Sequence, residues 1–325
     1  MTAQRQLTAE ECAQLIKDIN DPIVVMHARP DGDTTGTAAA LLEVLSALGK
    51  KGRYACQDTV PDRLAFILEG YEKAEPPFEG GIISVDVASP SQLGELKDQL
   101  TVDFMIDHHQ IAAPFAPIYS IPTASSAAEV LYGVIEVLIK NGDITLTEKI
   151  AKALYAGVSS DTGCFCYSNT TASTYRLAAL LVETGIDHAE INHKLFNSKA
   201  PEQLKAEGIT ASAVRLADGG KVGYAVITKA MRDESGILPQ HFETAIDIVR
   251  SVRGVEVAFA VKENDKGEFK VSLRSTGRNV ADVAASFGGG GHIRAAGCSV
   301  EAADAYLAAE LVLGALGVST EQTEK

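Results

Sequence analysis

Acidic and histidine residues directly follow apolar runs of this sequence, and these are the residue types that hold metal ions. The first such segment is His27-Ala28-Arg29-Pro30-Asp31-Gly32-Asp33, directly after the apolar run Ile23–Met26. Pro30 and Gly32 disfavour a helix and permit a tight bend, so one imidazole and two carboxylates can turn into one pocket. The plainer interpretation is a loop whose Asp caps a helix that begins near Thr35.

Three more segments place carboxylates in similar positions. Ser84-Val85-Asp86 and Met105-Ile106-Asp107-His108-His109 each end an apolar run, and Ser159-Ser160-Asp161-Thr162-Gly163 follows a helical pattern. Adjacent histidine side chains diverge, so one can bind metal while the other faces a substrate, and the neighbouring Asp107 can orient a ring nitrogen. The plainer alternatives are an N-cap or Asx turn, a polar strand end on the surface, and a helix-terminal turn.

Together these motifs supply a donor set of two histidines and four aspartates, with one histidine to spare. The set is His27, Asp31, Asp33, Asp86, His108 and Asp161. Oxygen-rich donors with a few imidazoles suit Mn²⁺ or Mg²⁺ better than Zn²⁺, with iron or cobalt as further candidates. Two ions about 3.5–4 Å apart could share a carboxylate, acidify water and neutralise phosphoryl oxygens. A nearby protonated histidine could then protonate the leaving oxygen.

The periodicity of the first half predicts the elements that position these side chains. Strand-length apolar runs alternate with helical patterns, which predicts an α/β fold with a doubly wound, mostly parallel sheet. The expected strands are Ile23–Met26, Ile82–Val85 and Asp103–Ile106, and the expected helices are Thr35–Leu48 and the stretches 89–99, 125–140 and 146–158. Sites in such sheets gather at the carboxyl ends of the strands, where the acidic motifs lie.

The second half predicts a smaller α+β domain. The expected strands are 221–228, 255–262, 269–274 and 297–300, with a final helix at 302–315. A charged, helical stretch precedes them. The predicted division is therefore a first domain at 1–190, a helical linker at 191–212 and a second domain at 213–325.

A glycine-rich motif in the second domain could bind an anion. It reads Phe287-Gly288-Gly289-Gly290-Gly291-His292-Ile293-Arg294 and continues to Gly297. Successive glycines let backbone N–H groups approach an anion, and His292 and Arg294 add donors. Upstream, Ser272-Leu273-Arg274-Ser275 adds an arginine suited to bidentate phosphate contacts. The plainer alternative is a flexible hinge loop.

Composition limits the partners and the compartment. The 325 residues include 29 Lys and Arg against 43 Asp and Glu, a net charge of −14. A long polyanion needs a broad basic surface, so long duplex nucleic acid is not an expected partner. The five cysteines form no CxxC pair and are read as reduced thiols. With no signal-peptide pattern and no long apolar run, we expect a cytoplasmic protein that does not associate with membranes.

The motifs resemble a known family. HARPDGDTTG, SVDVAS, IDHH and SSDTG resemble the four signatures of the DHH phosphoesterases, and VSLRS and FGGGGHIRAAG resemble the associated DHHA1 domain. The likeness is closest to the bifunctional oligoribonuclease and pAp phosphatases, or nanoRNases. One departure is Cys164 after SSDTG, where an arginine would be expected.

The resemblance implies a role for each residue. His27 and Asp31 would hold one ion, Asp33, His108 and Asp161 the other, and Asp86 would bridge both. His109, oriented by Asp107, would sit beside the leaving group. The implied nucleotide-binding groups are Arg274, Ser275, the backbone of Gly290 and Gly291, His292 and, more weakly, Arg294.

The implied activity is hydrolysis of oligoribonucleotides of a few residues to mononucleotides, together with removal of the 3′-phosphate of pAp. The alternatives are a linear or cyclic dinucleotide phosphodiesterase, a single-strand DNA exonuclease, and a nucleotide-binding regulator without activity. Relatives are often dimers, so a homodimer is a further expectation, although no stripe in the sequence marks an interface.

Overall fold

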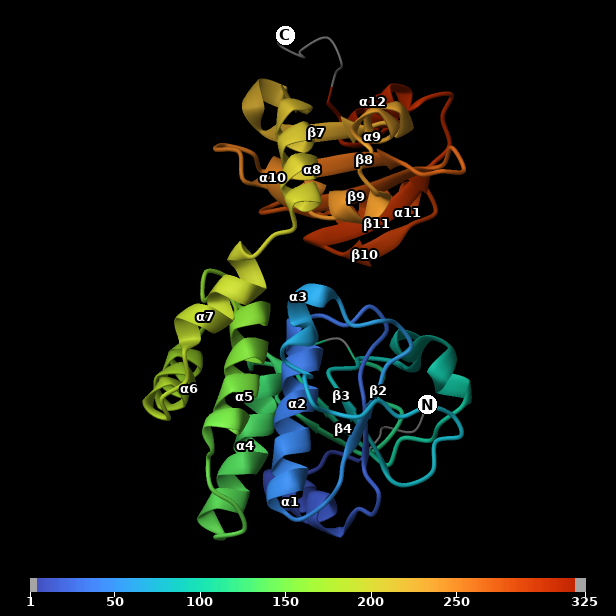
Figure 1. The fold of residues 1–325 in the computed structure, drawn as a ribbon. Coiled ribbons are helices and arrows are strands. Elements are labelled where there is room, and N and C mark those ends of the chain that lie inside the picture. Colours follow the sequence, from blue (N-terminus) through green and yellow to red (C-terminus); the bar gives the residue numbers. More distant parts are fainter. Residues whose placement is uncertain (1–4, 111, 319–325) are drawn as a thin grey trace. The chain divides into compact units, whose positions relative to one another are not determined.

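The computed structural model describes residues 5–110 and 112–318. The chain divides into two compact units, residues 1–198 and 199–325, and each is described by itself (Figure 1). Within the described residues, no helix combines the length and the apolar character that crossing a membrane requires.

The first unit is built on a parallel sheet of five strands in the order β2-β1-β3-β4-β5. The strands are β1 (Ile23–Val25), β2 (Arg53–Ala55), β3 (Ile82–Val85), β4 (Phe104–Asp107) and β5 (Ile118–Ser120). The chain winds one way from β1 to β2 and the other way from β3 onward. The adjacent strands β1 and β3 therefore flank a topological switch point, where the loops diverge and leave room for a ligand.

Both faces of this sheet are buried at its three central strands, which explains why β1, β3 and β4 are mostly apolar. Val24 packs with Leu41 and Leu131 in one core, whereas its neighbour Val25 packs with Leu93 in the core on the opposite face. The first core includes residues of α1 (Ala9–Asp18), α2 (Gly32–Ala47), α4 (Ala127–Lys140), α5 (Glu148–Asp161) and α6 (Ala172–Glu183). The predicted α/β class is confirmed.

Several helix boundaries differ from the prediction by two or three residues, and two of them concern donor residues. Helix α2 begins at Gly32 rather than near Thr35, because Asp31 is its N-cap and accepts hydrogen bonds from the amides of Asp33 and Thr34. Glycine and proline near a helix start do not prevent the first turn when such a cap is present. Helix α5 extends to Asp161, so this residue lies at the end of the helix and not in the turn that follows it.

The stretch 89–99 is not an α-helix. It forms the 3₁₀ segment η1 (Pro90–Asp98), which is interrupted by Gly94 in a left-handed conformation with φ 62°. Helix α7 (His188–Asn192) and the π-helical turn η2 (His193–Asn197) lie at the end of the first unit, and α8 (Pro201–Ser212) lies at the start of the second. The short α3 (Asp62–Ala65) completes the helices of the first unit.

The second unit has a mixed sheet of six strands in the order β10-β11-β9-β8-β7-β6. The strands are β6 (Val214–Ala217), β7 (Val222–Ile227), β8 (Val257–Glu263), β9 (Phe269–Ser275), β10 (Gly290–His292) and β11 (Ala295–Val300). One core of the unit includes residues of α11 (Val280–Ser286) and α12 (Ala305–Ala315), and a separate core includes residues of α10 (Ala245–Arg250). The remaining short helices are η3 (Asp218–Gly220), α9 (Lys229–Ser235) and η4 (Pro239–Phe242). The predicted α+β class of this domain is confirmed.

The glycine-rich motif is a hairpin and not an open loop. Gly290 pairs with Gly297 and Gly291 pairs with Ala296 in the antiparallel β10–β11 ladder. A Cβ at Gly291 would lie 2.5 Å from the carbonyl oxygen of Ala295, so the glycine is needed for the two backbones to approach. Strand β10 is an edge strand of the sheet, which leaves one of its sides unpaired.

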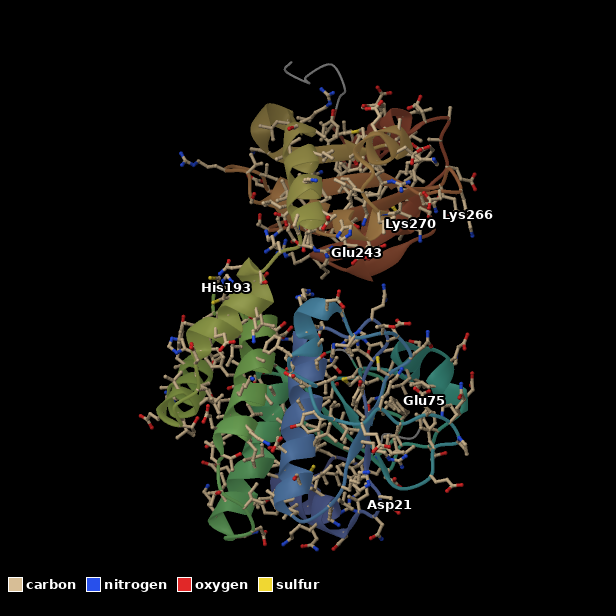
Figure 2. The ribbon with its side chains drawn as sticks, in the orientation of Figure 1. Asp21, Glu75, His193, Glu243, Lys266 and Lys270 are labelled. Atoms are coloured by element: carbon tan, nitrogen blue, oxygen red, sulfur yellow. The ribbon has the colours of Figure 1, made fainter. Side chains whose placement is uncertain are left out.

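Charged side chains cover the outside of each unit (Figure 2). The exposed acids Asp21 and Glu75 lie on the first unit, and Lys266 and Lys270 lie near each other on the second. These four charged side chains are therefore solvated.

Candidate metal centre

Six predicted donor side chains of the first unit come together at the carboxyl ends of β1, β3 and β4. His27 follows β1, Asp86 follows β3 and His108 follows β4, while helices α2 and α5 supply the other carboxylates. Five of the six side chains line a cavity of about 530 Å³: His27, Asp31, Asp86, His108 and Asp161. Asp33 lies beneath it and is 1% exposed. Strands β1 and β3 are those that flank the topological switch point.

One group of donors consists of His27, Asp31 and Asp86, whose ligand atoms lie within 4.8 Å of one another. His27 Nε2 is 3.6 Å from Asp31 Oδ1 and 3.6 Å from Asp86 Oδ2. The other ring nitrogen of His27, Nδ1, lies 2.8 Å from the carbonyl oxygen of Ala28. A carbonyl can only accept, so Nδ1 carries the proton, and Nε2 of the neutral ring is free to bind a metal.

A second group consists of Asp33, His108 and Asp161, again within 4.8 Å. His108 Nε2 is 3.8 Å from Asp33 Oδ2 and 3.8 Å from Asp161 Oδ2. It is also 3.5 Å from Asp86 Oδ1. Asp86 thus directs one carboxylate oxygen to each group of donors.

The backbone of Asp86 is unusual in a way that suits this position. Its φ is 58°, a left-handed conformation that non-glycine residues rarely adopt. Its amide donates to the carbonyl oxygen of Ile106 on β4, which holds the turn in place. The side chain is 3% exposed, and Oδ1 has no hydrogen-bond partner in residues 5–110 and 112–318. A buried carboxylate oxygen without a donor needs a cation, so the donor set fits a metal ion.

The pKa values of the histidines show how much negative charge is concentrated here. Burial opposes a charge on His27, yet hydrogen bonds and attraction to Asp31 and Asp86 raise its pKa to about 11. Burial likewise opposes a charge on His108, and Asp86, Asp33 and Asp161 raise its pKa to about 10. Protons on these imidazoles balance the carboxylates in the same way that metal cations would.

Burial and the concentration of negative charge also shift the pKa values of the carboxylates. Burial, followed by repulsion from Asp86 and Asp161, raises the pKa of Asp33 well above its usual value. Burial raises the pKa of Asp161 to about 6, with repulsion from Asp86 and Asp31 contributing. Burial alone would also raise the pKa of Asp31, but His27 and two backbone amides lower it instead. Divalent cations would relieve this repulsion.

His109 and Asp107 form a separate pair beside the two groups. His109 Nδ1 lies 2.7 Å from Asp107 Oδ1, and Asp107 is fully buried on β4. This hydrogen bond is the main reason that the pKa of His109 is raised. The ring also lines the cavity, with Nδ1 3.7 Å from Asp86 Oδ1. His109 is thus an oriented imidazole that favours its protonated form.

Backbone amides and an amide side chain hold the buried carboxylates in position. Asp33 Oδ2 accepts from the amide of Ala127 at 2.6 Å, and Oδ1 accepts from the amide of Ala128 at 3.1 Å, both at the start of α4. Asn169 Nδ2 donates to the carbonyl oxygens of Ser125 at 2.9 Å and Asp161 at 3.1 Å. Asn169 thus links the end of α5 to the start of α4. The sequence analysis assigned Asn169 no role, because Ser125 lies 44 residues away in the chain and only folding brings the two together.

The predicted substrate-binding residues all lie on the second unit, around β9, β10 and β11. Arg274 and Ser275 end β9, and Arg274 is the register partner of Ala295 on β11. Arg274 Nη1 donates to the carbonyl oxygen of Leu273 at 2.9 Å. Ser275 Oγ accepts from the amides of Gly277 and Arg278.

The glycine-rich motif brings the other predicted residues to the same edge of the sheet. Gly290, Gly291 and His292 form β10, and the carbonyl oxygen of Arg294, in the turn before β11, accepts from the amide of Ser275. The six predicted residues therefore cluster on one part of this unit.

The cavity of the first unit has three more lining residues with polar side chains that sequence reasoning gave no role: Arg29, Ser91 and Gln92. Arg29 lies inside the first motif, and an arginine among metal donors could have been predicted to contact an anion. The other two come from η1, which reaches the cavity because the carbonyl oxygen of Gln92 accepts from the amide of Ala28 at 2.6 Å. No sequence signal links those segments.

Family models match both units. The model described as "DHH family, N-terminal domain" matches residues 22–158, and that described as "DHHA1 domain" matches residues 219–315. The first range contains five of the six donors, and the second contains all of the predicted substrate-binding residues.

Named relatives match nearly the whole chain. A "Bifunctional oligoribonuclease and PAP phosphatase NrnA" from Thermus thermophilus is 28% identical over 312 residues, covering 94% of this chain and 92% of the relative. A protein of the same name from Bacillus subtilis is 28% identical over 296 residues, covering 88% and 92%.

A solved structure shares the fold. An exopolyphosphatase-related protein from Bacteroides fragilis superposes with a TM-score of 0.86 at 23% identity, covering 95% of each chain. Phosphoesterases of the DHH family depend on metal ions, and the clustered donors provide for them. The chain belongs to the DHH family of phosphoesterases, carries a DHHA1 domain and is a hydrolase.

Proposed function

We propose that this protein hydrolyses short oligoribonucleotides to mononucleotides and also removes the 3′-phosphate of pAp. The observation that supports this best is the convergence of two donor groups on one carboxylate, Asp86, in a cavity of the first unit. The relatives named as bifunctional oligoribonuclease and PAP phosphatase cover the chain at 28% identity. The names of these relatives are the reason for choosing short oligoribonucleotides and pAp as the proposed substrates.

The proposed cofactor is a pair of divalent ions, with Mn²⁺ first and Mg²⁺, Co²⁺ or Fe²⁺ as alternatives. His27 and Asp31 hold one, Asp33, His108 and Asp161 hold the other, and Asp86 serves both. Bound there, such ions neutralise charge on phosphoryl oxygens and acidify a water molecule. The preference for Mn²⁺ over Zn²⁺ follows from the four carboxylates and the absence of thiolates from the donor set.

His109 is the proposed general acid. Asp107 fixes its ring through the 2.7 Å hydrogen bond to Nδ1, which leaves Nε2 to deliver a proton. In ester hydrolysis a water oxygen forms a bond to phosphorus, the bond from phosphorus to the leaving oxygen breaks, and the leaving oxygen takes up the proton from the imidazole. Asp107 does not touch the substrate in this scheme and acts only by orienting His109.

The second unit is proposed to bind the nucleotide. Arg274 offers a bidentate phosphate contact, and the unpaired side of β10 offers the backbone amides of Gly290 or Gly291. Ser275, His292 and Arg294 lie on the same part of the unit. The net charge of −14 favours a small anion held by a few such groups over a long polyanion.

A direct test is to assay the Mn²⁺-loaded protein against three substrates: pAp, a ribodinucleotide and a long single strand. We expect turnover of the first two and little of the third. Activity confined to the long strand would contradict the proposal and favour an exonuclease. Manganese binding with no hydrolysis of any of the three would favour a binding protein.

A further inference from the structure

One arginine, Arg29, lines the cavity of the proposed metal centre. Arg29 lines it together with the donor side chains, and its side chain is exposed. Within the described residues, its guanidinium makes no hydrogen bond and no ion pair. Only the backbone amide of Arg29 is engaged, donating to Asp58 Oδ2 at 2.8 Å.

The nearby carboxylates already have other partners. Asp31 Oδ1 accepts from the amides of Asp33 and Thr34, and Asp86 faces the imidazoles of His27 and His108. An arginine that lines the same cavity as several carboxylates would ordinarily pair with one of them. Its five N–H donors remain available for a ligand of opposite charge that enters this cavity.

The backbone at Arg29 is held in an unfavourable conformation. Its φ is 55°, in the left-handed region, and proline follows it. The Asp58 bond and the bond from the amide of Ala28 to the carbonyl oxygen of Gln92, at 2.6 Å, fix two consecutive amides that lead into Arg29. Strain of this kind persists where the surroundings enforce it, and it is common in ligand-binding sites.

We propose that Arg29 binds the phosphoryl group that this centre hydrolyses. The proposal deepens the proposed function, on which it rests, by placing a phosphate contact on the metal-bearing unit itself. A planar guanidinium can bind two phosphoryl oxygens at once. The centre thereby gains a cationic group although position 164 holds a cysteine and not an arginine.

The informative variant is Arg29→Gly. Glycine adopts a φ of 55° without strain, so this variant should fold at least as stably as the wild type while lacking the guanidinium. Arg29→Lys keeps the charge and loses the bidentate geometry. Arg176→Ala is the matched control, because Arg176 is an exposed arginine of the same unit that does not line this cavity.

The variants are assayed with a ribodinucleotide and with bis(p-nitrophenyl) phosphate, whose only anionic group is the phosphoryl that reacts. We expect Arg29→Gly to raise KM by about 10- to 100-fold for both substrates, the range for lost hydrogen bonds to a charged group. Manganese content and Tm should not fall. Arg29→Lys and millimolar guanidinium added to Arg29→Gly should each restore part of the loss, and Arg176→Ala should match the wild type.

Binding of inorganic phosphate to the manganese-loaded protein, measured by calorimetry, tests the contact without turnover. We expect a loss of affinity of the same size in Arg29→Gly. Unchanged phosphate affinity, or a loss confined to the dinucleotide, would overturn the inference. A wild type that binds phosphate through Arg29 but hydrolyses no nucleotide would instead contradict only the proposed function.

Discussion

Asp86 is the residue through which the two donor groups of the centre are joined. Its oxygens lie 3.6 Å from His27 Nε2 and 3.5 Å from His108 Nε2, and one of them has no hydrogen-bond partner among the described residues. The other donor carboxylates each belong to one group with a single histidine. A change at Asp86 should therefore affect both groups at once.

We predict that Asp86→Asn lowers the phosphodiesterase activity by more than about a hundredfold, which exceeds the usual effect of losing a group that only supports a ligand. The amide keeps the shape of the side chain but lacks the charge needed by either ion. Asp98→Asn, at an exposed aspartate of η1, is the control and should retain activity. Full activity in Asp86→Asn, with normal manganese content by mass spectrometry, would show that Asp86 is not shared.

The donor residues could be found from sequence because aspartate and histidine at the ends of apolar runs are rarely needed for packing. The contacts of the donors could not be found in this way. Asp33 is held by amides of α4 that lie more than ninety residues further along the chain, and no local pattern links them. The availability of Arg29 was also hidden, because it depends on what its neighbours already bind.

At the scale of elements, the centre depends on how closely α2 and α5 pack. A Cβ on Gly36 of α2 would lie 2.6 Å from the backbone nitrogen of Gly157 on α5 and 2.7 Å from the carbonyl oxygen of Ala153. Both helices carry donors, Asp33 in the first turn of α2 and Asp161 at the end of α5. The separation of these helices therefore influences the distance between two ligands of the same ion.

We predict that Gly36→Ala destabilises the protein by about 1–3 kcal/mol, because backbone atoms cannot move aside as a flexible side chain would. Manganese affinity should fall as well, since the helices must separate. The control is Gly208→Ala in α8, where a Cβ meets nothing within 4 Å. It should be neutral or slightly stabilising in thermal unfolding. Equal effects in the two variants would argue against the packing explanation.

Glu129, in the first turn of α4, stabilises the start of that helix. Its Oε2 accepts from the amide of Ser125 at 3.0 Å, from Ser125 Oγ at 2.6 Å and from Thr174 Oγ1 at 3.1 Å. Burial alone would raise its pKa, but these hydrogen bonds lower it below the usual 4.5. A lowered pKa in the folded state means that the carboxylate stabilises the protein above pH 4.5. This contribution is lost as the pH falls through the folded-state pKa.

We predict that Glu129→Gln lowers the free energy of unfolding by about 2 kcal/mol at pH 7, and that this difference shrinks as the pH falls below about 4.5. Denaturant unfolding at several pH values measures it, and comparison with the wild type cancels the titration of the shared groups. Glu136→Gln, an exposed position of the same helix paired with Lys140, should change stability little at any pH. A difference that is constant with pH would exclude ionisation of Glu129 as the cause.

The elements that sequence periodicity located best are the buried strands and the amphipathic helices. The strands β3 and β9 lie within a residue of their predicted bounds, because continuous or alternating apolar patterns reflect burial directly. The misplaced elements depended on hydrogen bonds instead. Helix α2 started early because of the Asp31 cap, and the glycines of β10 paired with β11 although glycine has low strand propensity.

At the scale of the whole molecule, the two sets of proposed functional residues lie on different compact units. All six proposed metal donors belong to residues 1–198, and all predicted nucleotide-binding residues belong to residues 199–325. Each unit has its own sheet and its own hydrophobic cores. The proposed division between metal binding and nucleotide binding should therefore be visible in separable effects of mutation.

We predict that Arg274→Ala raises KM for the ribodinucleotide and pAp by at least about tenfold, the usual effect of losing a hydrogen bond to a charged group, and leaves the manganese content unchanged. The reason is that Arg274 ends β9 of the second unit and is proposed to bind a phosphate, whereas all six proposed metal donors belong to the first unit. Arg253→Ala, at an exposed arginine of the same unit, controls for the loss of one positive charge. Steady-state kinetics with metal analysis of the same samples separates the two effects. A large loss of bound manganese in Arg274→Ala would mean that the second unit contributes to holding the ions, and the division of labour proposed for the two units would then be wrong.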